Sequence, residues 1–363
     1  MKKSLIALAA LAASGFAMAQ SSVTLFGVVD AAVTAYDGAQ TTTGLGNSGN
    51  SSSRLGFRGV EDLGNGLKAG FHLEGAVAVD NGSGTGGGAG SDATVAQYSA
   101  FQFSRRSTIS LMGNFGELRL GRNLTSAYSA TSRYDNFGTV GVAGSGVWGD
   151  IGGVRRSNMI TYQSNDFSGF KFAVDYAFGE NVNAVNGGPV RSGDYYGVAA
   201  TYDNGPLSLG LSYFDQGRSV VAGDEGDGWS VGGSYNFGVV KLAAAYQAAD
   251  WAQKATEGTA KSESDNYLVA LSAPIGAAGE LKASYNRYQD KVGVEKAKAD
   301  QYSLGYVHNL SKRTAVYGTY SYLKNKNNGN AFTLGGAGMV DAAKAVDASG
   351  KIQAVQIGVR HNF

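Results

Sequence analysis

Residues 207–213 read LSLGLSY, with a large apolar side chain at every odd position and serine or glycine at every even one. Successive side chains of a β-strand point to opposite faces, so this segment is predicted to be a strand with one apolar and one small polar face. The same two-residue period recurs at 23–35, 67–79, 170–178 and 229–237. Because it recurs from end to end, the chain is predicted to be all-β.

The connections between these segments alternate in length. Short turn signals lie at 61–66, 113–116, 165–169, 203–206, 237–239, 274–279 and 309–312. Longer polar or glycine-rich stretches lie at about 37–50, 81–97, 124–156, 180–193, 218–227, 254–263, 292–298 and 325–349. These connections predict about sixteen strands, with the short turns at one end of the sheet and the long loops at the other.

The beginning of the chain is predicted to be a signal peptide covering residues 1–19. Lys2 and Lys3 precede a short apolar run, and residues 17–19 read AMA, a small-x-small cleavage pattern. The apolar run is too short for a membrane-spanning helix, which needs about 20 residues. Residues 20–363 are then expected to form the mature domain.

The composition agrees with strands that span a membrane. Only 43% of the residues are hydrophobic, they are spread evenly, and there is no cysteine. A soluble β-sandwich of this length would divide into domains around dry cores, and a solenoid would show a fixed repeat, but we find neither a linker nor a repeat. We therefore expect a transmembrane antiparallel β-barrel with short periplasmic turns and long extracellular loops.

Aromatic residues and the last strand support this interpretation. Eight tyrosines near predicted strand ends fit a girdle at the lipid–water boundary: Tyr162, Tyr176, Tyr202, Tyr213, Tyr235, Tyr246, Tyr320 and Tyr322. The chain ends in an alternating segment, 355–363, whose final residue is Phe363. That last strand has to pair, because a barrel leaves no open edge in lipid.

Several stretches resemble the trimeric general porins of Gram-negative bacteria, in the branch found in neisserial and related β-proteobacteria. They are SVTLFGVVD at 22–30, SRLGFRGVEDLGNGLKAG at 53–70, RRSTISLMGNFGELRLGR at 105–122, YVHNLSKRT at 306–314 and GVRHNF at 358–363. The resemblance implies a sixteen-stranded barrel, a homotrimer in outer-membrane lipid and passive diffusion. It also implies that the third long loop, 124–156, folds into the pore and that the barrel-assembly machinery reads the terminal Phe363. The Pro-Glu-Phe-Gly motif of the enteric porins is missing from this loop, so its path is left open.

Side chains alternate between the two faces of a strand, and this alternation, which we call strand parity, predicts which charges face the lumen. Arg54, Arg58, Glu74, Arg106 and Arg119 lie on the polar face of their strands, and Arg105, one residue off parity, could turn inward across a bulge. The third loop adds Arg133, Asp135, Asp150, Arg155 and Arg156. In the anion-selective relatives, the arginine cluster and its paired acid resemble Arg54, Arg105, Arg155 and Glu74 here.

These charges lead to two interpretations. Charged rings at the narrowest point of a pore filter ions, so arginines without equal acidic partners predict a preference for anions. The alternative is that they are ordinary lumen charges paired with Glu and Asp, which contribute little. We expect an outer-membrane porin for small hydrophilic solutes and ions, with small anions and polar solutes as its cargo. A substrate-specific channel is the second possibility, and a plugged barrel that acts as an adhesin or scaffold is the third.

Other signals point to no further chemistry. The match to G-x-G-x-x-G at 82–87 lies in a glycine-rich loop with no helix after it, and three scattered histidines without cysteine make a zinc site improbable. Asp224, Glu225 and Asp227 could bind Ca²⁺, but a solvated acidic loop is the simpler interpretation. Without the predicted signal peptide the net charge is 28 − 29 = −1, which argues against nucleic acid. We expect no catalytic residue, cofactor or metal.

Overall fold

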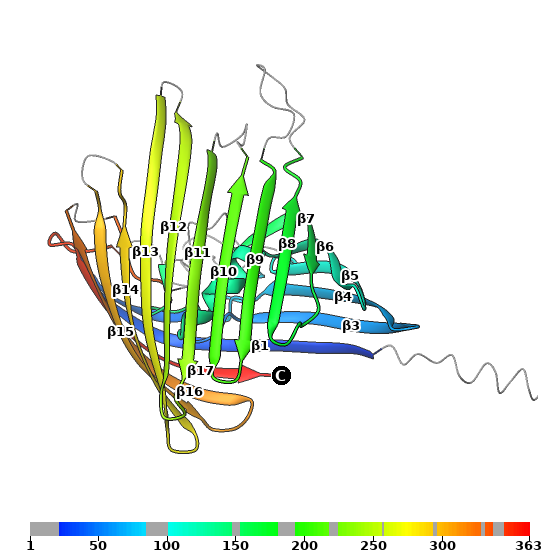
Figure 1. The fold of residues 1–363 in the computed structure, drawn as a ribbon. Coiled ribbons are helices and arrows are strands. Elements are labelled where there is room, and N and C mark those ends of the chain that lie inside the picture. Colours follow the sequence, from blue (N-terminus) through cyan, green and yellow to red (C-terminus); the bar gives the residue numbers. More distant parts are fainter. Residues whose placement is uncertain are drawn as a thin grey trace, which may run out of the picture.

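The computed structural model describes residues 22–84, 101–146, 153–180, 193–217, 224–255, 258–292, 296–327, 331–336 and 345–363. Most of these residues lie in one antiparallel sheet of seventeen strands that curves around a central space (Figure 1). The strands are β1 Ser22–Asp37, β2 Thr41–Asn47, β3 Arg54–Gly64, β4 Leu67–Ala76, β5 Arg106–Gly113, β6 Gly116–Leu124, β7 Arg155–Gln163, β8 Phe170–Ala177, β9 Tyr195–Asn204, β10 Leu207–Gln216, β11 Asp224–Asn236, β12 Lys241–Ala255, β13 Gly258–Ile275, β14 Gly279–Gln289, β15 Lys298–Asn309, β16 Thr314–Lys326 and β17 Lys351–Asn362.

The first and last strands close the sheet into a barrel. β17 pairs with β1 in a register that runs from Val28 opposite Asn362 to Asp37 opposite Gln353. The backbone of Phe363 extends this ladder by one residue, because it exchanges hydrogen bonds of 3.0 and 3.1 Å with Gly27. The final strand therefore has a partner along its whole length, as the hydrophobic surroundings of a barrel require.

The seventeen strands occupy sixteen strand positions around the barrel, which is the number of strands that the sequence predicts. β2 pairs with the second half of β1 and β3 pairs with the first half, so β2 and β3 together occupy one strand position of the barrel. The prediction of a loop at 37–50 is wrong for residues 41–47, which are β2. Their sequence, TTTGLGN, alternates too weakly to be recognised, although threonine favours strands.

The seven predicted short turns all fall between strands, but one predicted long loop does not exist as such. Residues 254–263 were expected to be a loop, yet β12 continues to Ala255 and β13 begins at Gly258. The two strands stay paired up to Ala255 and Gly258. The sequence of this stretch lacks the regular alternation of apolar and polar residues that marks a strand.

The two faces of the barrel differ as the alternation predicts. Leu211 and Val269 point outward and are 54% and 55% exposed, whereas Ser212 and Ser230 face inward and are 4% and 0% exposed. Outward tyrosines of neighbouring strands contact each other in tilted pairs: Tyr176 and Tyr196, and Tyr246 and Tyr267, are each 5.0 Å apart between ring centroids. The apolar face is therefore turned away from the interior of the barrel.

Between β6 and β7 the chain turns into the barrel. It forms two short helices, α2 at Ser126–Thr131 and η1 at Ser132–Tyr134 (Figure 1). Thr125 caps α2, since its side chain accepts a hydrogen bond from the Tyr128 backbone N–H. The predicted loop at 124–156 is slightly shorter in the structure, because Leu124 ends β6 and Arg155 and Arg156 begin β7. We call residues 125–154 the third loop from here on. No helix in the described part of the chain is long and apolar enough to span a membrane.

Candidate functional site

Small residues of the barrel wall receive the first part of the third loop. The ring of Tyr134 lies on Gly232, where a Cβ atom would come within 2.3 Å of Cδ2 of the ring. Next to it, the Thr131 hydroxyl lies 2.8 Å from the Ser230 hydroxyl. The serine and glycine that the sequence places on the inner face of β11 thus form a flat surface against which η1 packs.

The second part of the loop is fastened further along the same side of the barrel, to the strands that follow β12. Asn136 donates Nδ2 hydrogen bonds to the carbonyl oxygens of Leu271, at 2.7 Å, and Ala283, at 3.1 Å. The Gly146 backbone N–H donates to the Tyr288 hydroxyl at 2.9 Å. Because these contacts come from β13 and β14, the loop runs along the inside of the wall rather than out into solvent.

Asp135 holds the loop together from within. Its carboxylate accepts hydrogen bonds from the backbone N–H groups of Phe137, Thr139 and Ser145 at 2.8–2.9 Å, and the residue is only 5% exposed. Burial raises the pKa of Asp135, and the three N–H groups oppose this rise because they favour the charged form. Asp135, predicted from the sequence to be a pore charge, is enclosed by the loop and does not line the cavity.

Arg54, Arg105 and Arg155 come together around Glu74. The Arg105 Nε lies 2.5 Å from Glu74 Oε1, and the Arg54 Nε lies 3.9 Å from Oε2. Arg155 donates an Nε hydrogen bond of 2.9 Å to the Arg105 carbonyl oxygen. Arg105 precedes the first residue of β5, which frees it from strand parity and lets it turn inward.

Arg122 belongs to the same group, although strand parity alone would place it on the lipid face. The ladder between β6 and β7 shifts between Gly121 and Asn123, and Arg122 then donates hydrogen bonds to the Ser104 carbonyl at 2.5 Å and the Ser157 hydroxyl at 2.9 Å. Gly121 has φ +119°, and a Cβ there would lie 2.2 Å from the Ser107 carbonyl oxygen. A glycine inside a strand is the signal that could have indicated the bulge.

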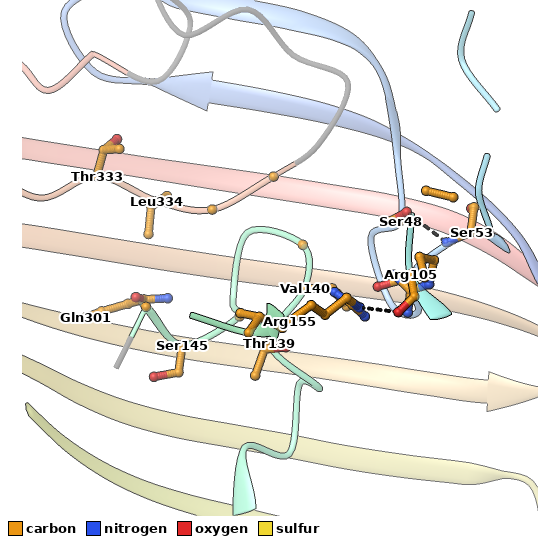
Figure 2. A pocket seen from close by; sticks show the side chains of 18 of the residues that line it. Ser48, Ser53, Arg105, Thr139, Val140, Ser145, Arg155, Gln301, Thr333 and Leu334 are labelled. Atoms are coloured by element: carbon orange, nitrogen blue, oxygen red, sulfur yellow. Dashed lines mark hydrogen bonds between the residues drawn. The ribbon is translucent and has the colours of Figure 1, made fainter. Parts of the chain in front are cut away.

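A cavity of about 890 Å³ separates this arginine group from the third loop. Figure 2 shows Arg155 near the centre beside Thr139 and Val140 of the loop, with Arg105 on one side and Gln301 on the other. Four arginines (54, 105, 122 and 155) and one acid, Glu74, gather here among the described residues. The charge around the cavity is therefore positive.

The other predicted charges lie apart from this cavity. Arg106 donates to the Thr108 hydroxyl at 3.1 Å, Arg119 pairs with Glu117 at 2.7 Å, and Arg58 stacks 5.1 Å from the Phe26 ring centroid. Arg133 pairs with Asp203 at 2.5 Å, and Arg156 donates to Gln216 and stacks 5.0 Å from the Tyr195 ring. Asp150 lies outside the described residues. Two of these five arginines, Arg119 and Arg133, are thus paired with an acid, whereas four arginines share one acid at the cavity.

Comparison with known proteins identifies the family. Residues 5–328 match the family model described as Gram-negative porin. The chain belongs to the Gram-negative porin family. This porin is 45% identical to outer membrane porin protein 32 of Delftia acidovorans over the full length of both chains. It is 35% identical to the major outer membrane protein P.IB of Neisseria meningitidis serogroup B, over 54% of this chain and 55% of that one.

Solved structures agree with this assignment. The anion-selective porin from Comamonas acidovorans superimposes with a TM-score of 0.78 at 39% identity, covering 95% of this chain and 100% of that one. The fold, the family and the outer-membrane location predicted from the sequence are confirmed. The relatives are porins, which are channels rather than enzymes.

Proposed function

We propose that this porin lets small hydrophilic solutes and ions diffuse through a water-filled passage, and that it prefers anions. The observation that carries the preference is the group of four arginines around one glutamate at the cavity. Guanidinium groups stay charged at physiological pH, and low-dielectric walls focus their field into the passage. The similarity to a porin described as anion-selective supports the proposal.

The third loop is proposed to form the constriction, within the bounds 124–156. It is held against the inside of the barrel by contacts with β11 and β13, so it lies within the lumen and narrows it, and the cavity beside it is lined by arginines. Arg54, Arg105, Arg122 and Arg155 are then the selectivity residues, and Glu74 orients two of them. Passive diffusion requires no catalytic group.

We further propose that three copies assemble and that Phe363 serves as the assembly signal. The outward side chains of β17 and β1 are aliphatic, including Val29, Val33 and Ile357 at 39%, 54% and 65% exposure. Tyr213 and Trp229, by contrast, are outward on β10 and β11. Tyrosine and tryptophan favour the lipid–water boundary, so an aliphatic sector without them suits a protein partner.

The proposal is tested by measuring reversal potentials in planar bilayers under a KCl gradient. A reversal potential displaced toward the chloride equilibrium potential is expected, and the displacement should shrink at high salt because salt screens the arginines. Preference for potassium would contradict the proposal. A conductance that saturates for one solute would instead favour a substrate-specific channel.

A further inference from the structure

His72 is the one histidine of this chain whose side chain faces the lumen. The sequence holds three histidines, and the structure describes all of them. His308 lies on the outer face beside Tyr306, whose hydroxyl is 3.1 Å from its Nδ1. His361 continues the outward face of β17. His72 instead lies two residues before Glu74 on the inner face of β4. Histidine ordinarily changes its charge between about pH 5 and pH 8, so one such group lies in the passage.

The imidazole of His72 is placed to bind Glu74 once it is protonated. Its Nε2 lies 3.5 Å from Glu74 Oε2. This nitrogen is buried and makes no hydrogen bond within the part of the chain that the structure describes. The ring contacts Phe26 edge-to-face, with 5.2 Å between the ring centroids. Protonation places an N–H on both ring nitrogens, so the imidazolium donates from Nε2 to the carboxylate whichever tautomer preceded it.

Glu74 has an oxygen that can accept this hydrogen bond. Its Oε1 is 2.5 Å from the Arg105 Nε, whereas its Oε2 is 3.9 Å from the Arg54 Nε. The His72 Nε2 is therefore closer to Oε2 than the Arg54 guanidinium is. Arg54 keeps its orientation without the acid, because its Nη1 also donates to the Ser52 carbonyl oxygen at 3.2 Å. A charged His72 therefore occupies Oε2 and leaves the charge of Arg54 available to an ion in the passage.

The other charges around His72 are mostly positive. Its register partners are Arg58 on β3 and Thr108 on β5, and Phe26 of β1 carries no charge. A second cavity, of about 240 Å³, lies on the side of the short turns and is lined by His72. The charged groups that face His72 from the surrounding elements are Arg54 and Arg58 of β3, Glu74 of its own strand, Arg105 and Arg106 at the start of β5, and Glu117 of β6.

We propose that His72 sets the strength of the anion preference according to pH. The inference deepens the proposed function and rests on it. When the ring is neutral, Glu74 cancels part of the charge of the arginine group. When the ring is protonated, it binds Glu74 Oε2 and adds one positive charge to the passage. The positive field then continues from the arginine group to Arg58 and Arg106, toward the short turns.

The test uses the full-length porin in planar bilayers of zwitterionic lipid, with reversal potentials measured under a KCl gradient at low salt. Between about pH 8 and pH 5 the ratio of chloride to potassium permeability should rise about twofold, the effect of one exposed charge interaction. His72→Gln removes the titrating ring and should give a flat profile at the weaker preference. His72→Arg fixes the charge and should give a flat profile at the stronger preference. His308→Gln, on the outer face, is the control and should respond to pH as the unchanged porin does.

A pH response that persists in His72→Gln would overturn the proposal, and so would a flat profile in the unchanged porin. A response that survives in His72→Gln but disappears in Glu74→Gln would make the carboxylate the sensor, which also overturns it. Preference for potassium at every pH would contradict the proposed function instead. The change of the reversal potential with pH would still decide the role of His72 in that case, because it is read separately from the sign of the preference.

Discussion

At the scale of single residues, selectivity depends on how few acids accompany the arginines. Glu74 contacts Arg105 at 2.5 Å and Arg54 at 3.9 Å, whereas Arg155 and Arg122 are held by carbonyl oxygens. A carbonyl oxygen orients a guanidinium without cancelling its charge. The group therefore keeps most of its positive field while its geometry stays fixed.

Arg155→Ala and Arg54→Ala are each expected to lower the anion preference by a factor of about 2, since an exposed charge interaction is worth about 0.5 kcal/mol. Glu74→Gln should change the preference in the opposite direction, because it removes the one acid of the group. Reversal potentials at low salt measure both effects. Lys326→Ala, on the outer surface, is the control and should match the unchanged porin; a similar loss in that variant would mean that the effect is not local.

Residue-level predictions from the sequence succeed where parity decides and fail where the backbone departs from it. Arg54 and Glu74 follow directly from the alternation of their strands. Arg122 does not, because one bulge at Gly121 reverses its direction. Asp135 carries the right charge for a pore residue, but only the folded loop shows that three backbone N–H groups surround it.

At the scale of elements, the third loop depends on glycines at its contacts with the rest of the barrel, one in the wall and one in the loop. Gly232 lies under the Tyr134 ring, and Gly141, at φ +66°, lies against the Gly49 carbonyl oxygen, which a Cβ would approach to 2.1 Å. Such contacts join residues more than ninety positions apart, since 232 − 134 = 98 and 141 − 49 = 92. The sequence indicates the bounds of the loop through its composition, but it cannot indicate which wall residues receive it, and it gave no sign of α2 or η1.

Gly232→Val is expected to displace Tyr134 and loosen the loop, because a Cβ at this position would lie 2.3 Å from the ring. Overpacking of this kind costs about 1–3 kcal/mol, enough to populate a second arrangement of the loop. Single-channel recordings should then show a changed conductance and larger current fluctuations. Gly318→Val is the matched control, since a Cβ there meets no atom within 4 Å. Unchanged current fluctuations in both variants would contradict this account of the loop.

At the scale of the whole molecule, the outer surface is divided into sectors. Aliphatic side chains cover β17 and β1, and tyrosine and tryptophan are outward on β10–β16. The alternation in the sequence predicts the apolar band but not this division, since each strand reads as apolar regardless of what it faces. Only the closed order of the strands brings the first and last segments into one surface.

Ile357→Trp is expected to split the proposed trimer, because a large ring added to a packed protein contact cannot be accommodated. Val231→Trp makes the same change on β11, where lipid would yield to it. Light scattering of the detergent-solubilised variants should give a monomer mass for the first and a trimer mass for the second. A trimer in both cases would remove the aliphatic sector from the contact.

The closure of β17 onto β1 also limits how such a protein can change over evolutionary time. Each strand reverses the direction of the chain. The start of β1 and the end of β17 therefore meet at the same rim of the barrel, because the number of strand positions is even. Gaining or losing one strand would carry the carboxyl terminus to the opposite side of the bilayer, and Phe363 would lose its two backbone hydrogen bonds to Gly27. Lineages that keep this antiparallel closure can therefore widen or narrow the barrel only by whole hairpins, while the length of a surface loop is free to change one residue at a time.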